Sequence, residues 1–123
     1  MKLLWIAVAG ALGALSRYGL SGVVANRSGG AFPWGTFAVN VSGSFALGLI
    51  FTLLTERFLP HTTVRTALTV GFLGAYTTYS TFAFETVRLA EDGALGIAAL
   101  NIGATVIAGI AAVIGGIWLG RAL

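Results

Sequence analysis

The chain alternates four long apolar runs with short polar connectors. The runs cover residues 3–24, 34–54, 64–87 and 94–119, and the connectors hold nearly all of the charge. Each run is near the roughly 20 residues that a helix needs to cross a hydrocarbon core of about 30 Å. The pattern therefore predicts an all-α membrane protein with one transmembrane domain, residues 1–123. Four spans would place both termini on the same side of the membrane.

The third run contains an unusual density of polar groups. Residues 71–85 read Gly-Phe-Leu-Gly-Ala-Tyr-Thr-Thr-Tyr-Ser-Thr-Phe-Ala-Phe-Glu. In hydrocarbon, each unsatisfied polar group costs several kcal/mol. We therefore expect this stretch to face the protein interior, a water-filled path or a bound ion.

A break in the third helix is predicted at mid-membrane, between Gly74 and Thr77. Glycine lowers helix propensity by about 1 kcal/mol, and clustered Ser and Thr compete for backbone hydrogen bonds. A break at this depth would expose carbonyl oxygens, which are hard ligands suited to an alkali cation. It would also free N–H groups of the second half-helix to meet an anion.

Two other runs carry polar and small residues at steps of four, which places each set on one face of a helix. These stripes are Thr36, Asn40, Ser44 and Gly48 in the second run, and Asn101, Thr105 and Gly109 in the fourth. Either stripe could be a packing seam joined by interhelical hydrogen bonds. The alternative is a pore lining, in which the Asn40 amide offers two N–H donors to an anion.

The first run combines small residues with one cationic side chain. Gly10, Gly13 and Ala14 precede Arg17, which lies about two-thirds of the way along the span. Small residues allow neighbouring backbones to approach closely. Three roles are open for Arg17: an anchor that reaches the headgroups, a partner of carbonyls at a helix end, or a positive charge at the mouth of an anion path.

Composition excludes several classes of function. The chain is 57% hydrophobic and 9% charged, with a mean hydropathy of +0.93, far from an ordinary soluble domain. The absence of cysteine excludes disulfides, thiolate metal sites and a cysteine nucleophile. No nucleophile–base pair or metal-ligand cluster is visible, so we do not expect an enzyme. The net charge of +3 is scattered rather than gathered in a patch, which argues against nucleic-acid binding.

The basic residues are nearly balanced between the two sides of the membrane. The side of the termini would hold Lys2, Arg57, Arg65 and Arg121, whereas the opposite side would hold Arg27 and Arg88, with Arg17 leaning towards it. This is a weak positive-inside bias, so the chain is expected to insert in both orientations. A four-helix chain of 123 residues is also too small to shield a polar path alone, which predicts a homo-oligomer.

Three motifs are spread along the chain. They read Gly10-Ala-Leu-Gly-Ala-x-x-Arg17-Tyr, Pro33-Trp-Gly-Thr36-Phe-x-Val-Asn40-x-x-Gly43 and Gly71-Phe-x-Gly74-x-x-Thr77-Thr-Tyr-Ser-Thr-Phe82-x-x-Glu85. In residue types, order and spacing they resemble the Fluc (CrcB) fluoride channels. The resemblance covers all four predicted helices and nearly the whole chain.

The resemblance implies a channel that passively exports fluoride from a bacterial cell across the inner membrane and so relieves fluoride toxicity. It further implies a dual-topology homodimer of antiparallel subunits with two fluoride pathways. One structural sodium ion would lie at the dimer centre. Its ligands would be the backbone carbonyls of Gly74 and Thr77 from each subunit.

The same resemblance implies a set of residues along the fluoride pathway. The aromatic pair that flanks fluoride would be Tyr79 and Phe82, with Asn40 as a donor beside them. The other expected pathway residues are Ser80, Thr81, Thr36, Thr105 and Asn101, and the arginine of the first motif, Arg17, is expected in a vestibule or structural role.

The chain departs from the family pattern at two places. Tyr79 stands where phenylalanine is usual, and Ala75-Tyr76 stands where a second glycine is common. The tyrosine keeps the ring edge of phenylalanine and adds a hydroxyl group.

Two other functions fit a chain of this size. A small dual-topology proton-coupled exporter would share the charge balance but needs a titratable group well inside the membrane. The only carboxylate within a predicted span is Glu85, near the end of the third helix, which favours passive conduction. A structural subunit without a transport path would not need the polar stripes.

Overall fold

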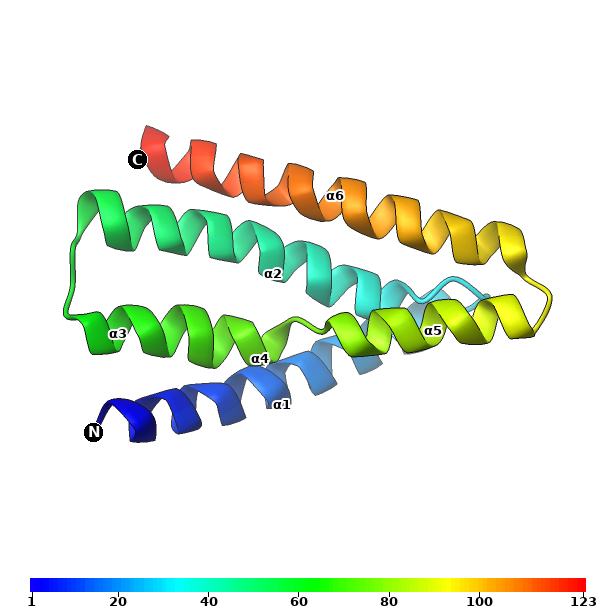
Figure 1. Ribbon diagram of the computed structural model, residues 1–123, viewed down its shortest axis with the longest axis horizontal. Helices are drawn as coiled ribbons and strands as arrows, with labels where there is room; N and C mark the ends of the chain where they lie inside the picture. Colours follow the sequence, from blue (N-terminus) through cyan, green and yellow to red (C-terminus); the bar gives the residue numbers. More distant parts are fainter.

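The computed structural model describes residues 1–123 as a bundle of helices without strands (Figure 1). The elements are α1 (Lys2–Ser28), α2 (Trp34–Thr52), η1 (Leu53–Arg57), α3 (Thr62–Thr66), η2 (Ala67–Leu73), α4 (Gly74–Tyr76), α5 (Tyr79–Glu91) and α6 (Leu95–Ala122). The two η elements are π-helical turns that continue α2 and α3. The expectation of an all-α protein is confirmed.

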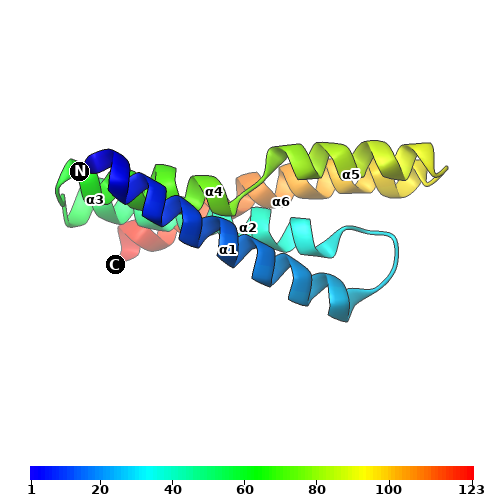
Figure 2. The same ribbon diagram turned by 90° about the horizontal axis from the view of Figure 1, so that it is seen from below.

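Three continuous helical segments are long and apolar enough to cross a membrane: Lys2–Ser28, Trp34–Arg57 and Leu95–Ala122. The remaining helical residues, from Thr62 to Glu91, follow one line along the bundle but are interrupted after α4 (Figure 1). Both chain termini lie at one end of the molecule, which we call the terminal end. The connectors 29–33 and 92–94 lie at the other end (Figures 1 and 2).

Glycines bring α2 and α6 into close contact. A Cβ on Gly116 would overlap the carbonyl oxygen of Phe45, and one on Gly48 would overlap that of Val113. Gly120 is buried against Thr52 in the same way. The Gly116-x-x-x-Gly120 spacing thus serves helix packing, as small residues at this spacing do in membrane helices.

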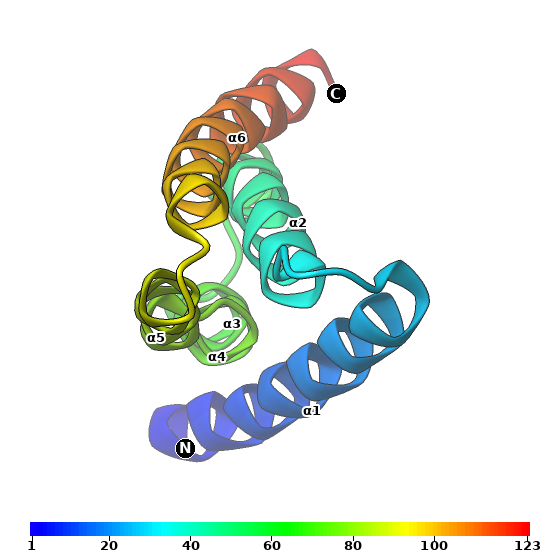
Figure 3. The same cartoon turned by 90° about the vertical axis from the view of Figure 1, so that its right-hand side faces the viewer.

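The first helix crosses η2 through its small residues. A Cβ on Gly13 would overlap the backbone carbonyl of Phe72, and one on Gly71 would lie 3.0 Å from both the Ile6 carbonyl oxygen and the Ala9 Cβ. Viewed along the bundle, α1 and α6 lie on opposite outer sides, with α2 between them (Figure 3). The helices around the interruption are therefore held by close contact near their middle.

Few residues are buried within a single chain. Only 14 of 123 residues are buried, and large apolar side chains such as Val70, Ile107 and Trp118 are 62%, 71% and 72% exposed. An apolar surface of this extent requires hydrocarbon or another protein surface to cover it. The fold is that of a membrane protein, whose outer side chains are solvated by lipid.

Candidate ion-binding site at the interrupted helix

The interruption consists of two residues with extended backbone. Thr77 has φ −84° and ψ 158°, and Thr78 has φ −149° and ψ 114°. The sequence predicted the break between Gly74 and Thr77, and the structure places it at the end of that segment and one residue beyond. Gly74 itself is helical, with φ −62° and ψ −36°, so glycine is not the residue that leaves the helix.

Thr78 ends the interruption by capping the next helix. Its hydroxyl oxygen accepts the backbone N–H of Thr81 at 3.3 Å and donates to the Thr81 hydroxyl at 3.1 Å. A threonine at this position satisfies one of the free N–H groups that every helix start presents. Tyr79 is then the first residue of α5.

The side chain of Asn40 binds both backbone groups of Thr78. Its Nδ2 donates to the Thr78 carbonyl oxygen at 3.0 Å, and its Oδ1 accepts the Thr78 N–H at 2.8 Å. This pair replaces the bonds that a continuous helix would give this residue. Of the two amide N–H donors counted in the sequence, one is used here and one is left for another acceptor.

Arg17 reaches the same region from α1. Its Nε donates to the carbonyl oxygen of Ala75 at 3.1 Å, and the side chain is half-buried. Of the three roles open from the sequence, this hydrogen bond is of the second kind, with a carbonyl at a helix end. A cation is favourable there because the carbonyl end of a helix is the negative end of its dipole.

Three carbonyl oxygens near the interruption, those of Gly74, Tyr76 and Thr77, accept no hydrogen bond within the chain. The Thr78 N–H, which would bind the Gly74 carbonyl in a continuous helix, is taken by Asn40. The Thr77 carbonyl accepts no hydrogen bond. Neutral carbonyl oxygens of this kind are ligands that suit a hard cation.

Further contacts hold the residues around the interruption against α2. The Ser42 and Tyr76 hydroxyl groups lie 2.8 Å apart, and the Tyr76 ring stacks on Phe72 with centroids 6.0 Å apart. A Cβ on Gly43 would overlap the Thr77 side chain. Sequence reasoning noted Tyr76 only as a departure from the family pattern and did not single out Ser42, because Ser42 lies off the stripe of steps of four.

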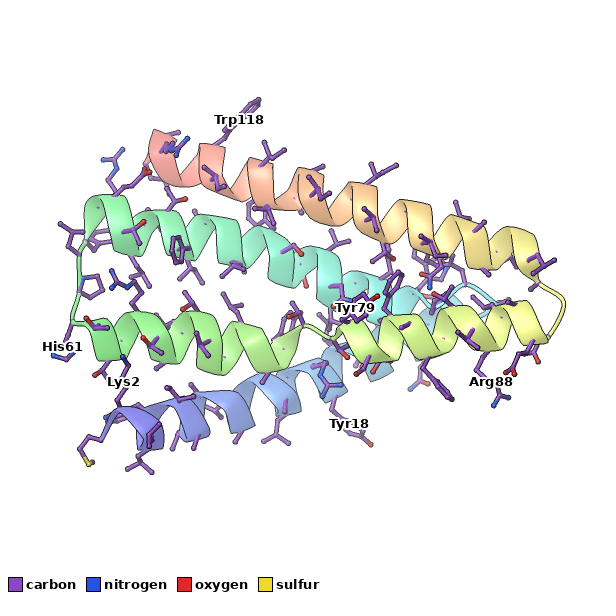
Figure 4. The ribbon with its side chains drawn as sticks, in the orientation of Figure 1. Lys2, Tyr18, His61, Tyr79, Arg88 and Trp118 are labelled. Carbon is purple, nitrogen blue, oxygen red and sulfur yellow. The ribbon has the colours of Figure 1, made fainter.

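Tyr79 and Phe82 form an aromatic pair in the first turn of α5. Their ring centroids are 5.8 Å apart and the ring planes are inclined by 58°. Phe82 is 9% exposed, whereas Tyr79 is 78% exposed and Figure 4 shows it beside the interruption. The Phe82 ring thus lies between helices of this chain, whereas the Tyr79 ring is exposed on its surface.

An open cavity of about 900 Å³ lies between the end of α1, the start of α2 and α5. Figure 2 shows the connector 29–33 on one side of this region and α5 on the other. Its polar lining includes Ser21, Asn26, Thr36, Thr81, Glu85 and Arg88. Thr36 is buried and Thr81 is half-buried, whereas Ser80 is exposed and lies outside the lining. One Glu85 carboxylate oxygen is buried without a hydrogen-bond partner.

The polar residues of α6 form a separate group. Asn101 is 1% exposed, and its Nδ2 donates to the Thr86 hydroxyl at 2.9 Å. The Thr105 hydroxyl donates to Asn101 Oδ1 at 3.3 Å, and the Thr86 hydroxyl donates to the Phe82 carbonyl at 2.8 Å. These hydrogen bonds therefore join α5 to α6 one helical turn after Phe82. Thr86 was not singled out from the sequence, although it lies one helical turn after Phe82.

Five of the predicted residues fall into two separate groups. Asn40, Thr77 and Arg17 meet at the interruption through direct hydrogen bonds or close packing. Asn101 and Thr105 bond to each other and to α5 instead.

Comparison with known proteins assigns the chain to a family. Residues 4–117 match the family described as CrcB-like protein, Camphor Resistance (CrcB). A protein of Solibacter usitatus, named fluoride-specific ion channel FluC, is 50% identical over 123 residues, which cover 100% of this chain and 98% of the relative.

Two further relatives carry the same name. The protein of Acidobacterium capsulatum is 48% identical over 98% of this chain and 93% of its own length. The protein of Geotalea uraniireducens is 56% identical over 80% of each chain. These relatives are named as ion channels, so the family is one of transport proteins rather than enzymes. The chain belongs to the CrcB family and is an integral, multi-pass protein of a bacterial membrane.

Proposed function

We propose that this protein is a fluoride-selective channel through which fluoride leaves the bacterial cell passively across the inner membrane, relieving fluoride toxicity. The observation that carries the proposal is the interruption at Thr77 and Thr78, which Asn40 holds open beside the Tyr79–Phe82 pair. The name fluoride-specific ion channel, given to relatives that match the whole chain, agrees with it.

The pathway runs past donors that replace the water around fluoride. This ion is small and strongly hydrated, so a narrow path needs fixed N–H and O–H groups together with positive ring edges. The free N–H of Asn40 and the ring edges of Tyr79 and Phe82 are such groups. The hydroxyl groups that extend the path are those of Thr36, Ser80, Thr81 and Thr105, with the Asn101 amide beside Thr105. Several modest sites in series allow release as well as entry.

The working unit is an antiparallel, dual-topology homodimer with two pores. The exposure of Tyr79 and the small number of buried residues support a second copy as the missing wall of each path. The near-balanced basic residues support insertion in both orientations. An antiparallel pair has its two-fold axis in the membrane plane, where two interruptions can meet.

A structural sodium ion would lie on that axis. The Gly74 and Thr77 carbonyls of each subunit would hold it, and neither carbonyl accepts a hydrogen bond within the chain. When bound, the ion ties the subunits together and adds positive potential for nearby anions.

The alternative, a proton-coupled exporter, depends on a titratable group inside the membrane. Glu85 is the only carboxylate within the predicted spans, and it lines the open cavity rather than the interruption. A single carboxylate at the edge of the path favours passive conduction over obligatory proton exchange.

A flux assay in liposomes tests the function. Protein is reconstituted into vesicles loaded with potassium fluoride, and fluoride efflux is recorded with a fluoride-selective electrode after valinomycin is added. Valinomycin carries potassium out with the fluoride, so that no membrane potential builds up to stop the efflux. We expect rapid efflux of fluoride, little efflux of chloride from matched vesicles, and no change when a protonophore collapses the pH gradient. Efflux that requires a proton gradient would refute the channel and favour the exporter.

A further inference from the structure

An apolar groove runs along the outside of the bundle between α1 and α3. It has a volume of about 360 Å³ and is lined by Trp5, Val8, Ala9, Leu12, Thr63, Val64, Ala67 and Leu68. Apart from the Thr63 hydroxyl, the lining is hydrocarbon and aromatic. The size falls within the roughly 300–1,000 Å³ that small-molecule sites occupy.

The groove follows from how α1 packs. Gly13 and Gly71 bring α1 against η2 near the middle of the molecule. Towards the terminal end the two helices diverge (Figure 1). The α1 residues of the lining, from Trp5 to Leu12, span about two turns or 10 Å. The groove therefore runs parallel to the helices and is open to the lipid; its narrow apolar part is called the slot.

One cation and one ring N–H donor lie at the outer end of the groove. Lys2 lies one helical turn before Trp5 and makes no ion pair. The His61 Nδ1 accepts the Thr63 N–H at 3.1 Å, so a neutral His61 ring carries its proton on Nε2 and can donate from there. Figure 4 shows Lys2 and His61 at the same end of the molecule, beside the starts of α1 and α3.

The charge of the two ends of the bundle differs. The terminal end carries Lys2, Arg57, Arg65 and Arg121 with one carboxylate, Glu56, which already pairs with Arg121 at 3.3 Å. The opposite end carries Arg27 and Arg88 with Glu91 and Asp92. Only the groove end thus offers an uncompensated cation directly beside an apolar slot.

We propose that this groove binds one anionic phospholipid. An acyl chain fills the slot between α1 and α3, and the phosphate is held by Lys2 and the Nε2–H of His61. Trp5 marks the level of the interface, where tryptophan is enriched. Each basic residue near a membrane surface contributes about 1 kcal/mol towards an anionic lipid, which is roughly a fivefold preference. The proposal does not depend on what ion the protein conducts.

Quenching of tryptophan by brominated lipids tests this site. The chain has three tryptophans, so a Trp34→Phe, Trp118→Phe variant reports on Trp5 alone. In mixed bilayers we expect phosphatidylglycerol with brominated chains to quench Trp5 with roughly fivefold higher apparent affinity than the matching phosphatidylcholine. A Trp5→Phe, Trp34→Phe variant reports on Trp118, which lies beside the paired Arg121, and should show no preference.

Two substitutions then locate the headgroup. Lys2→Gln should bring the preference at Trp5 towards one, whereas Arg27→Gln, an equal change of charge at the opposite end, should leave it unchanged. His61→Ser keeps a cap acceptor for the Thr63 N–H and removes the ring donor, so it should lower the preference in part. Soluble glycerol phosphate should not compete, because it has no chain for the slot.

Equal quenching of Trp5 by the two lipids would overturn the proposal. So would the same anionic preference at Trp5 and Trp118, which would indicate a general layer of anionic lipid. A preference that survives Lys2→Gln would remove the assigned phosphate ligand. Circular dichroism of each variant checks that the helices are intact.

Discussion

Asn40 and Thr78 form the contact on which the interruption depends, with the Asn40 side chain accepting the Thr78 N–H at 2.8 Å and donating to its carbonyl at 3.0 Å. The two residues lie 38 positions apart. At membrane depth no water is available to satisfy an extended residue, so a side chain from α2 takes the place of the missing helical bonds.

Asn40→Ala should destabilise the protein by about 1–3 kcal/mol, because it leaves two backbone groups of Thr78 without partners. Fluoride flux should fall with it, since the interruption would be free to reform as helix. Ser16→Ala, at an exposed position of α1 outside the cavity lining, is the control and should alter neither property. Thermal unfolding in detergent and liposome flux measure the two effects. An unchanged melting temperature for Asn40→Ala would contradict the role of this contact.

Phe82→Ile should reduce fluoride flux to roughly the level of empty liposomes while the protein stays folded. The substitution keeps an apolar side chain in a buried position but removes the ring edge proposed to face the anion. Phe84→Ile is the control, because Phe84 lies on the same helix and is 64% exposed. Normal flux in Phe82→Ile would remove this ring from the pathway.

Tyr79→Phe should retain fluoride flux within about twofold. The ring edge that would meet the anion is common to both residues, and the Tyr79 hydroxyl makes no hydrogen bond within the chain. A loss of flux comparable to that of Phe82→Ile would show that the hydroxyl group itself is part of the path.

Much of the fold follows from local properties of the sequence. Three of the four apolar runs reappear as continuous helices, the third run appears as an interrupted one, and the small face of α1 makes close contacts, because hydropathy and residue size act over a few turns. The structure extends the first predicted helix from residue 24 to Ser28, since the turn-rich connector begins only at Gly29, where φ is +65°.

The details of the site depend on contacts between distant residues. The sequence places a break between Gly74 and Thr77, but its exact position at Thr77 and Thr78 is set by Asn40 and by the Thr78 cap. The partner of Arg17, 58 residues away, is likewise a product of how α1 crosses η2. Periodicity identified Asn101 as part of a stripe, yet only the packing of α5 on α6 gives it Thr86 as a partner. The sodium site, the pores and the dimer remain predictions.

Gly13→Ala should destabilise the protein by about 1–3 kcal/mol, the usual cost of overpacking. The added Cβ would meet the backbone of Phe72, which cannot move aside as a flexible side chain would. Gly19→Ala on the same helix is the control, because nothing lies within 4 Å of its Cβ position. There alanine should be neutral or stabilising by up to about 1 kcal/mol through helix propensity. Equal melting temperatures for the two variants would argue against the close crossing of α1 and η2.

Leu123→Cys tests mixed orientation, because the natural chain has no cysteine and Leu123 is exposed at the terminal end. An impermeant maleimide added outside intact cells should modify about half of the copies if the chain inserts both ways. Replacing Arg27 and Arg88 by Gln removes the basic residues of the opposite end and strengthens the positive-inside signal of the terminal end. The labelled fraction should then fall well below half, since the terminal end would be retained in the cytoplasm. Complete labelling, or none, of Leu123→Cys itself would reject dual topology.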